Sequence, residues 1–313
     1  VNRRFHTPHI AIAATGGFAG SEVGGYFGAE LKRAGWDLLL IEGAAPEPVY
    51  LSIRDDHAEL RSAAHLAGQD TGDVEDLIRQ ELGDGHVRVS QCGPAGERLS
   101  LLANIIHDRN RAAGRGGLGA VLGAKRLRAV AVRGSRRPPV ADGGTLKTMA
   151  AWFREHWQDT SSAPFPTVGT NRMVRANNNV GGLPTRNFQQ GVFEGFESLT
   201  AERLRDTITV DRDTCFGCPL RCKWVVEVPS GPNPVDRRYG GPEYETTCAM
   251  GALCGIDDLA AVAYANQLCN AKGLDTIGAG VTAAWAMECS QRGLLTTGMP
   301  RRPTLFPYTS LIC

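Results

Sequence analysis

The sequence lacks any apolar run of the roughly 20 residues that a membrane-spanning helix needs. Its first residues, VNRRFHTPHIAIAATGG, also lack the apolar stretch and cleavage site of a secretory signal. Neither sign of charge is in excess, because 34 Lys and Arg are balanced by 33 Asp and Glu. A field that would attract nucleic acid or an anionic membrane is therefore not expected. These absences predict a cytoplasmic protein that binds neither.

A disulfide framework is not expected either, since the nine cysteines are an odd number. Three of them crowd into CFGCPLRC, as Cys215, Cys218 and Cys222. Thiolates bind soft or borderline metals, and this C-x2-C-x3-C spacing lets three sulfurs reach one centre. Three close ligands and a distant fourth suit a [4Fe–4S] cluster, while a structural zinc or three unconnected buried thiols are the alternatives. The other six cysteines are expected to be small core residues.

The fold predicted from the pattern is α+β. In residues 1–140, apolar and β-branched runs bounded by Gly and Pro predict strands, while apolar spacing predicts one helix over Gly72–Leu82. The predicted strands are Asp37–Gly43, Pro48–Ile53, His86–Cys92 and Leu127–Gly134. Residues 135–144 are basic and contain proline, which is typical of a linker.

Residues 141–313 are predicted to form a mainly helical domain that carries the cysteine motif and is incomplete at its C-terminal end. Gly273 and Gly293 are expected to stop two of the helices. The predicted helices are Thr145–Trp157, Leu199–Asp206, Asp257–Gly273 and Val281–Leu295.

Two glycine-dense segments are candidates for binding phosphate. They are ATGGFAGSEVGGYFG (Ala14–Gly28) and AAGRGGLGAVLGAK (Ala112–Lys125), the second flanked by Arg111 and containing Arg115. Glycine lets backbone N–H groups approach a phosphate, and arginine binds phosphate through two parallel hydrogen bonds. One glycine loop alone is usually only a turn. Two such loops in one sheet domain indicate a large phosphate-bearing cofactor.

Carboxylates in two further segments are candidate site residues. Glu243 and Glu245 follow a Gly-Gly-Pro turn in GGPEYET, and Asp275 lies just past a predicted helix end. The ordinary roles of such residues are solvation or helix capping. Beside a buried cofactor, however, a carboxyl group with a raised pKa can transfer protons.

Taken in order, these segments resemble one family. They are GGYFGAELKRAGWDLLLIEG, GPAGE, RAAGRGGLGAVLGAKRLRAVAVRG, LPTRNF, CFGCPLRC, GGPEYET and CNAKGLDTIGAG. In combination they are similar to the aldehyde ferredoxin oxidoreductases, which hold tungsten in a bis-pyranopterin cofactor. The resemblance covers roughly residues 3–295.

The resemblance implies a sheet domain that cradles a tungsten or molybdenum bis-pyranopterin, with Mg²⁺ as a candidate further ion. Family members often have Asn at the position of Glu22, and Asn270 replaces the first Asp of the D-x-x-G-L-D pattern. Three of the family's four cluster ligands match Cys215, Cys218 and Cys222. The implied cofactor contacts are Arg4, Glu22, Gly24, Gly25, Arg111, Arg115, Gly116, Gly117, Gly119 and Asp275.

The implied reaction is oxidation of an aldehyde to a carboxylic acid, with electrons passing through the cluster to ferredoxin or another electron-transfer subunit. Glu245, or failing it Glu243, is the candidate proton carrier. A related tungsten enzyme, such as the catalytic subunit of benzoyl-coenzyme A reductase, is an alternative. Where some members bind a bridging iron through E-x-x-H, this chain has Tyr264 and Gln267, so that iron is not expected. A homodimer is compatible with the sequence.

The family's fourth cluster cysteine belongs to a G-L-C motif in a C-terminal domain that this sequence does not include. Cys313 is not expected to replace it, and the ending after Leu295 departs from the family pattern. The fragment alone is therefore expected to be inactive, and an inactive truncated remnant is the third alternative.

Overall fold

The computed structural model describes residues 7–12 and 17–295. Its contacts divide the chain into two compact units. The first comprises Val1–Thr167, Asp213–Cys222 and Asn270–Asp275, and the second comprises Val168–Arg212, Lys223–Cys269 and Thr276–Cys313. The cysteine motif and the Asn270–Asp275 segment thus group with the sheet, whereas the sequence predicts one boundary near residue 140.

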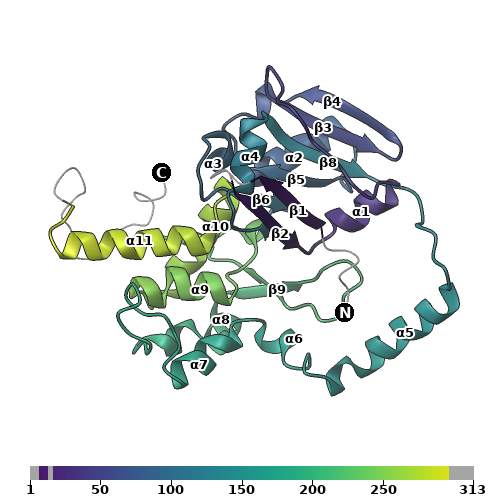
Figure 1. Cartoon of the computed structure of the whole chain (residues 1–313). Helices are drawn as coiled ribbons and strands as arrows, with labels where there is room; N and C mark the ends of the chain where they lie inside the picture. Colours follow the sequence, from purple (N-terminus) through teal and green to yellow (C-terminus); the bar gives the residue numbers. More distant parts are fainter. Residues whose placement is uncertain (1–6, 13–16, 296–313) are drawn as a thin grey trace. The chain divides into compact units, whose positions relative to one another are not determined.

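The centre of the first unit is a six-stranded mixed sheet in the order β4-β3-β8-β5-β6-β7, in which only β3 and β8 are parallel (Figure 1). The predicted strands at Pro48–Ile53, His86–Cys92 and Leu127–Gly134 are confirmed. The strands are β3 (Val49–Arg54), β4 (His57–Ser62), β5 (Arg88–Cys92), β6 (Ile105–His107), β7 (Arg111–Ala113) and β8 (Leu127–Arg133).

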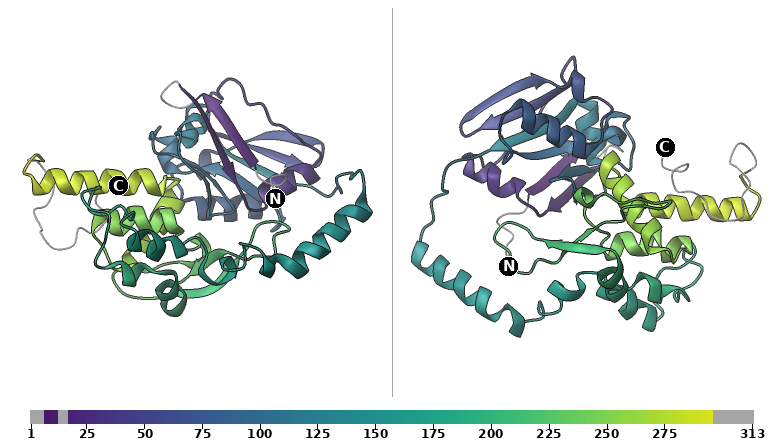
Figure 2. Two further views of the ribbon diagram at one scale, coloured as in Figure 1. Left: turned by 60° about the horizontal axis from the view of Figure 1, so that its bottom comes forward. Right: turned by 180° about the vertical axis from the view of Figure 1, so that it is seen from behind.

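Both faces of this sheet are covered, as strand β8 illustrates. Side chains alternate along a strand, so Ala129 and Ala131 pack on one face and Val130 and Val132 on the other. The first face lies under α2 (Thr71–Glu81), which confirms the helix predicted over Gly72–Leu82. The second face lies under α1 (Phe27–Arg33), α4 (Leu118–Ala124) and the two-stranded sheet of β1 (Thr7–Ile12) and β2 (Phe18–Val23). The opposite views in Figures 1 and 2 show these two coverings.

The predicted strand at Asp37–Gly43 is wrong, because it pairs with no strand in the described structure. Its apolar side chains still alternate in burial. Leu39 and Ile41 pack against the core on the second face of the sheet, whereas Leu38 and Leu40 are exposed.

The remaining helices of the first unit are short or exposed. Helix α5 (Gly143–His156) confirms the helix predicted from Thr145 and buries none of its residues. Asp142 caps it by accepting a hydrogen bond from the N–H of Thr145. The other elements are α3 (Pro94–Glu97) and the 3-10 turns η2 (Ala64–Leu66) and η3 (Trp157–Asp159), and α6 (Phe165–Val168) leads into the second unit.

The second unit is mainly helical, as predicted. Trp224 on β10 is fully buried and donates through its indole N–H to Asn171 at the start of α7; the Asn171 amide donates to Thr247 on α9. These bonds tie three elements together. The elements are α7 (Arg172–Asn179), η4 (Phe196–Leu199), α8 (Ala201–Thr207), β9 (Thr209–Asp213), β10 (Lys223–Val226), η5 (Arg237–Tyr239), α9 (Tyr244–Met250), η6 (Ala252–Cys254), α10 (Leu259–Lys272) and α11 (Thr276–Gln291).

The predicted helices of this unit are confirmed, but α11 differs from its prediction at both ends, since it stops at Gln291 rather than at Leu295. Gly273 ends α10 with a left-handed φ of 73°, a conformation that glycine adopts without steric cost. Helix α11 begins at Thr276 rather than at the predicted Val281. None of the described helices is long and apolar enough to cross a bilayer.

Candidate cofactor site

The loop after β2 is held against the turn between β6 and β7. Gly25 has a φ of +99°, and a Cβ atom added there would lie 2.6 Å from Cδ of Arg111 and 2.9 Å from the Asp108 carboxylate. The backbone N–H of Tyr26 donates to that carboxylate over 2.9 Å. A side chain at position 25 would collide with these atoms, so glycine is required there. The contacts bring the glycine segment before α1 next to Arg111, which flanks the second glycine segment.

Arg111 joins these loops to the cysteine motif. Its guanidinium donates to Sγ of Cys215 at 3.2 Å, to the Asp213 carboxylate at 3.0 Å and to the carbonyl oxygen of Thr214 at 2.6 Å. The side chain is only 8 % exposed, and its Nε–H has no partner among the described residues. Burial by itself would lower the pKa of Arg111, but Cys215 and the nearby carboxylates outweigh it and raise that pKa.

The predicted glycine loop packs closely beside this arginine. Arg115, Gly116 and Gly117 have φ values of 67°, 69° and 67°, so three consecutive residues are left-handed. A Cβ atom at Gly116 would lie 2.7 Å from Cβ of Ala19, and one at Gly119 would lie 2.3 Å from the carbonyl oxygen of Asn104. Both positions therefore exclude any larger residue.

The same loop presents unused hydrogen-bond donors. Within the described part of the chain, the backbone N–H groups of Arg115–Leu118 make no hydrogen bond, and the Arg115 side chain is exposed. A row of open amides beside an arginine is the arrangement that binds phosphate oxygens.

Asp275 lies next to this loop, as the sequence predicts for a shared cofactor. Its carboxylate is 4.0 Å from the position that a Cβ atom of Gly114 would occupy, and its backbone N–H donates to the carbonyl oxygen of Leu102. Asp275 and Asn270 are both buried. A buried carboxylate beside open amides is a specific acceptor for the N–H groups of a ligand.

The three motif cysteines lie in the loop between β9 and β10; they form no disulfide among the described residues and are partly exposed. Left-handed residues at Gly217 and Arg221 turn this loop, and the Thr214 hydroxyl donates to the carbonyl oxygen of Cys218 at 2.7 Å. Among the described residues, no three His, Cys, Asp or Glu side chains surround one point as metal ligands. The donor chemistry suits a thiolate-bound metal, and the ligand assignment stays a prediction.

These features fit a phosphate-bearing pterin group. The glycine positions form a cradle that a Cβ atom would fill, the amides of Arg115–Leu118 are open, and Arg111 has a buried N–H to spare. Two further predicted contacts are not brought into this cradle by the described structure. Arg4 is outside the described residues, and Glu22 is exposed on β2.

The candidate proton carriers belong to the second unit. Glu243 precedes α9, accepts a hydrogen bond from the Thr170 hydroxyl at 2.5 Å and lies 3.6 Å from the Lys223 ammonium. Glu245 occupies the first turn of α9 and is exposed. The Glu243 carboxylate is therefore held by two neighbours, whereas the Glu245 carboxylate is exposed.

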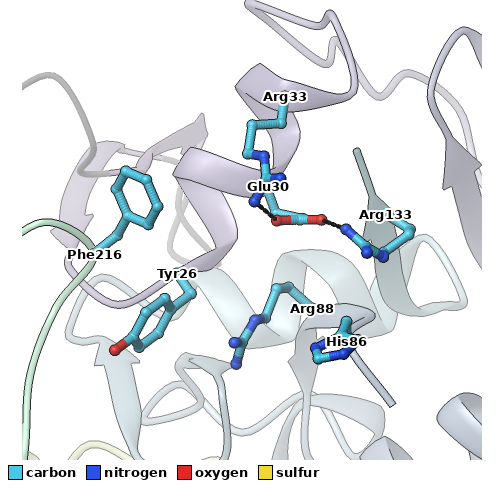
Figure 3. Close-up of a pocket in the computed structure, with 7 residues that line it drawn as sticks. All are labelled: Tyr26, Glu30, Arg33, His86, Arg88, Arg133 and Phe216. Atoms are coloured by element: carbon cyan, nitrogen blue, oxygen red, sulfur yellow. Dashed lines mark hydrogen bonds and ion pairs between the residues drawn. The ribbon is translucent and has the colours of Figure 1, made fainter. Parts of the chain in front are cut away.

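A pocket of about 280 Å³ lies beside the cysteine loop and was not anticipated from the sequence (Figure 3). Glu30 lies between Arg33 and Arg133 and forms ion pairs with both. The Arg88 guanidinium lies 4.5 Å from the centre of the Tyr26 ring. The pocket is lined by Tyr26, Glu30, Arg33, His86, Arg88, Arg133 and Phe216. Three arginines against one carboxylate give this lining a positive charge.

Sequence reasoning also missed Asp108 and Asp213, which fix Tyr26 and Arg111. The left-handed φ of 47° at Asp108 is its only distinguishing local property. The polar sequence Asp108-Arg109-Asn110 is typical of a turn, but it does not identify the partners of Asp108.

Two family models match the sequence. The one described as aldehyde ferredoxin oxidoreductase, N-terminal domain, matches residues 9–134, and the one for domains 2 and 3 of the same enzyme matches residues 146–305. The chain belongs to the aldehyde ferredoxin oxidoreductase family. This confirms the resemblance drawn from the motifs.

Relatives in this family are about twice as long as the chain. The tungsten-containing aldehyde ferredoxin oxidoreductases of Thermococcus kodakarensis and Pyrococcus abyssi are each 42% identical, over 288 and 286 residues. The match covers 90% of this chain and 46% of each relative. The WOR-like subunit of an aliphatic sulfonate oxidoreductase of Pyrococcus furiosus is 31% identical over 303 residues, which are 90% of this chain and 47% of that protein. The chain spans about half the length of the curated relatives it matches.

A solved structure shares the fold. The active-site complex BamBC of benzoyl-coenzyme A reductase with 1,5-dienoyl-CoA superposes with a TM-score of 0.80 at 24% identity, covering 98% of this chain and 48% of that one. At this identity the likeness shows the fold alone, and it confirms the predicted α+β class.

Proposed function

We propose that the family-length protein containing this sequence oxidises aldehydes to carboxylic acids. The reaction is RCHO + H₂O → RCOOH + 2 H⁺ + 2 e⁻, with the electrons leaving through a [4Fe–4S] cluster to ferredoxin. The observation that carries the proposal is Arg111, which connects the glycine-lined cradle directly to the cysteine motif. The glycine-lined cradle and the thiol-rich loop belong to one compact unit, which supports a cofactor bound close to the cysteines.

The roles of the residues follow from their surroundings. A bound tungsten pterin group supplies the two-electron redox chemistry of this family. The open amides of Arg115–Leu118 and the Arg115 guanidinium bind its phosphate, and the Asp275 carboxylate accepts hydrogen bonds from its pterin ring. Cys215, Cys218 and Cys222 provide three thiolates for the cluster, and the fourth ligand comes from outside this sequence.

Glu245 moves the proton. Its carboxylate is accessible, so it can face a substrate without breaking a structural hydrogen bond. A positioned carboxylate within hydrogen-bond reach of the reacting group can act in general acid–base catalysis. Glu243 is less suited because Thr170 and Lys223 already hold it.

Aldehydes are favoured over the other substrates that relatives' names suggest. Relatives named for aldehyde oxidation are 42% identical to the chain, while the sulfonate-oxidising relative is 31% identical. The benzoyl-coenzyme A reductase likeness supports the fold and not the substrate.

The test is cofactor content and aldehyde-dependent reduction of benzyl viologen, measured on an anaerobically purified family-length protein carrying this sequence. We expect tungsten, pterin phosphate, iron and sulfide in stoichiometric amounts. Arg115→Ala is expected to lower the tungsten and pterin content, and Arg115→Lys to restore it only partly because an ammonium lacks the planar fork. The exposed Arg205→Ala serves as the control. Stoichiometric zinc without iron, or pterin content unaffected by Arg115→Ala, would contradict the proposal.

A further inference from the structure

An unpaired apolar segment lies between α1 and β3. Figure 1 draws no strand in this part of the chain. Among the described residues, no hydrogen bond is made by the backbone of Leu38–Glu42, although Lys125 donates to the carbonyl oxygen of Gly43 at one end. Five consecutive residues therefore have peptide groups with no partner in the described part of the chain, which is unusual in a segment that contributes to a core.

The side chains of this segment follow the pattern of a strand. Leu39 and Ile41 pack against the core above the six-stranded sheet, whereas Leu38 and Leu40 are 77% and 79% exposed. Alternation with a period of two is the signature of extended backbone with two distinct faces. The segment is already fixed on one face, so its register toward any partner is set.

The layer to which the segment belongs is incomplete. Residues of β2 and of this segment pack on the same core, including Ala19, Val23, Leu39 and Ile41. In that layer β1 and β2 pair only with each other, and a two-stranded sheet is marginal by itself. Phe18 at the start of β2 is also 80% exposed. Open backbone groups and exposed apolar side chains thus occur in one layer.

We propose that Asp37–Glu42 is the edge of a second sheet and that it pairs with a β-strand supplied by the part of the family-length protein outside this sequence. An extended chain can bond the peptide groups of alternate residues along one edge of the segment, and apolar residues on its own alternate positions would pack beside Leu38 and Leu40. The chain spans about half of its relatives, so a family-length protein contains as much sequence again to provide such a strand.

Hydrogen exchange tests the pairing without any activity assay. The probe is the portion of the Thermococcus kodakarensis relative that lies outside its match to this chain, co-expressed as separate polypeptides. In the 313-residue chain alone, the amides of Leu38–Glu42 should exchange rapidly. In the reconstituted complex the amides of alternate residues, whose N–H groups face the added strand, should exchange at least about 100-fold more slowly, because ladder amides open only with the surrounding sheet.

Three variants distinguish pairing through backbone hydrogen bonds from non-specific hydrophobic association. Leu40→Pro removes a donor, and the double change Leu38→Lys with Leu40→Lys charges the exposed face without touching the backbone. Each should weaken capture of the probe by at least about tenfold and leave the melting temperature of the isolated chain unchanged. Leu60→Lys is the matched control, since Leu60 is 63% exposed on β4 but its strand is already paired.

The outcomes that would overturn the proposal are distinct. Slow exchange of these amides in the dilute isolated chain would mean that the segment already has a partner within it. Protection that rises with chain concentration, together with a dimer in light scattering, would assign the edge to a second copy. Unchanged exchange in a complex that does form would leave the segment outside any sheet.

Discussion

The cofactor loops of the first unit and the Glu243–Glu245 turn of the second differ in how tightly their surroundings constrain them. At Gly25, Gly116 and Gly119 the neighbouring atoms leave no space for a Cβ atom. Glu245, by contrast, stands exposed on the first turn of α9. Binding of the cofactor needs backbone clearance and fixed donors, which one compact unit can build alone. Proton transfer at neutral pH needs a desolvated carboxylate, which requires a further surface over Glu245.

The largest effect on activity is expected from substitution of the exposed Glu245. Glu245→Gln in the family-length protein should slow aldehyde oxidation by about 10²–10⁴-fold, the usual contribution of general acid–base catalysis, with tungsten and iron content unchanged. Turnover with benzyl viologen and metal analysis measure both quantities. Glu243→Gln is the matched control. A normal rate in Glu245→Gln together with a large loss in Glu243→Gln would move the role to Glu243.

Substitution at a crowded glycine should chiefly affect stability. Gly119→Ala places a Cβ atom 2.3 Å from a backbone carbonyl oxygen, so we expect the free energy of unfolding to fall by about 3 kcal/mol or more. Urea denaturation of the chain measures it. Gly85→Ala is the control, because nothing lies within 4 Å of a Cβ atom there. Equal stability of the two variants would show that the loop can move aside and that Gly119 is not tightly constrained by its surroundings.

A buried histidine pair offers a pH test of the constrained unit. Nε2 of His9 on β1 lies 2.8 Å from Nε2 of His107 on β6, which also contacts the Ser90 hydroxyl at 3.0 Å. Burial lowers the pKa of His9 from 6.5 to about 4 and that of His107 well below its usual value. Below pH 6.5 these two histidines are therefore protonated in the unfolded chain while they remain neutral in the folded chain.

Stability from this pair should be complete above about pH 6.5 and fall as the pH drops toward 4. The expected loss is about 2–3 kcal/mol from His9. Thermal or urea unfolding between pH 7 and pH 4 measures it, and His9→Gln should flatten that part of the profile. An identical pH profile in the variant would mean that the imidazoles are charged in the folded protein.

The smallest effect is expected at the pocket beside the cysteine loop. Arg88→Glu reverses a charge near Phe216, so the KM for an acidic ferredoxin should rise by roughly fivefold while viologen reduction stays normal. The effect should shrink at high salt. Arg205→Glu, on exposed α8, is the charge-matched control. Equal effects of the two variants would indicate net charge and not a docking position.

Local patterns in the sequence determined much of this protein. The apolar runs specified β3, β5 and β8, the spacing of Val74 and Ile78 specified α2, and Gly273 specified the end of α10. These features depend on neighbours within a few residues, so composition and periodicity suffice to predict them. The motif order likewise identified the family, which the family models confirm.

The tertiary structure decided what depends on distant partners. Strands β6 and β7 have three residues each and no sequence signal, and they form because β6 pairs with β5 and β7 pairs with β6. Asp37–Gly43 has a clear strand pattern but pairs with no strand among residues 7–12 and 17–295. The site follows the same rule. The residue types of Arg111 and Cys215 were predictable, but their contact across 104 positions was not, because a hydrogen bond between distant segments depends on how the whole unit packs.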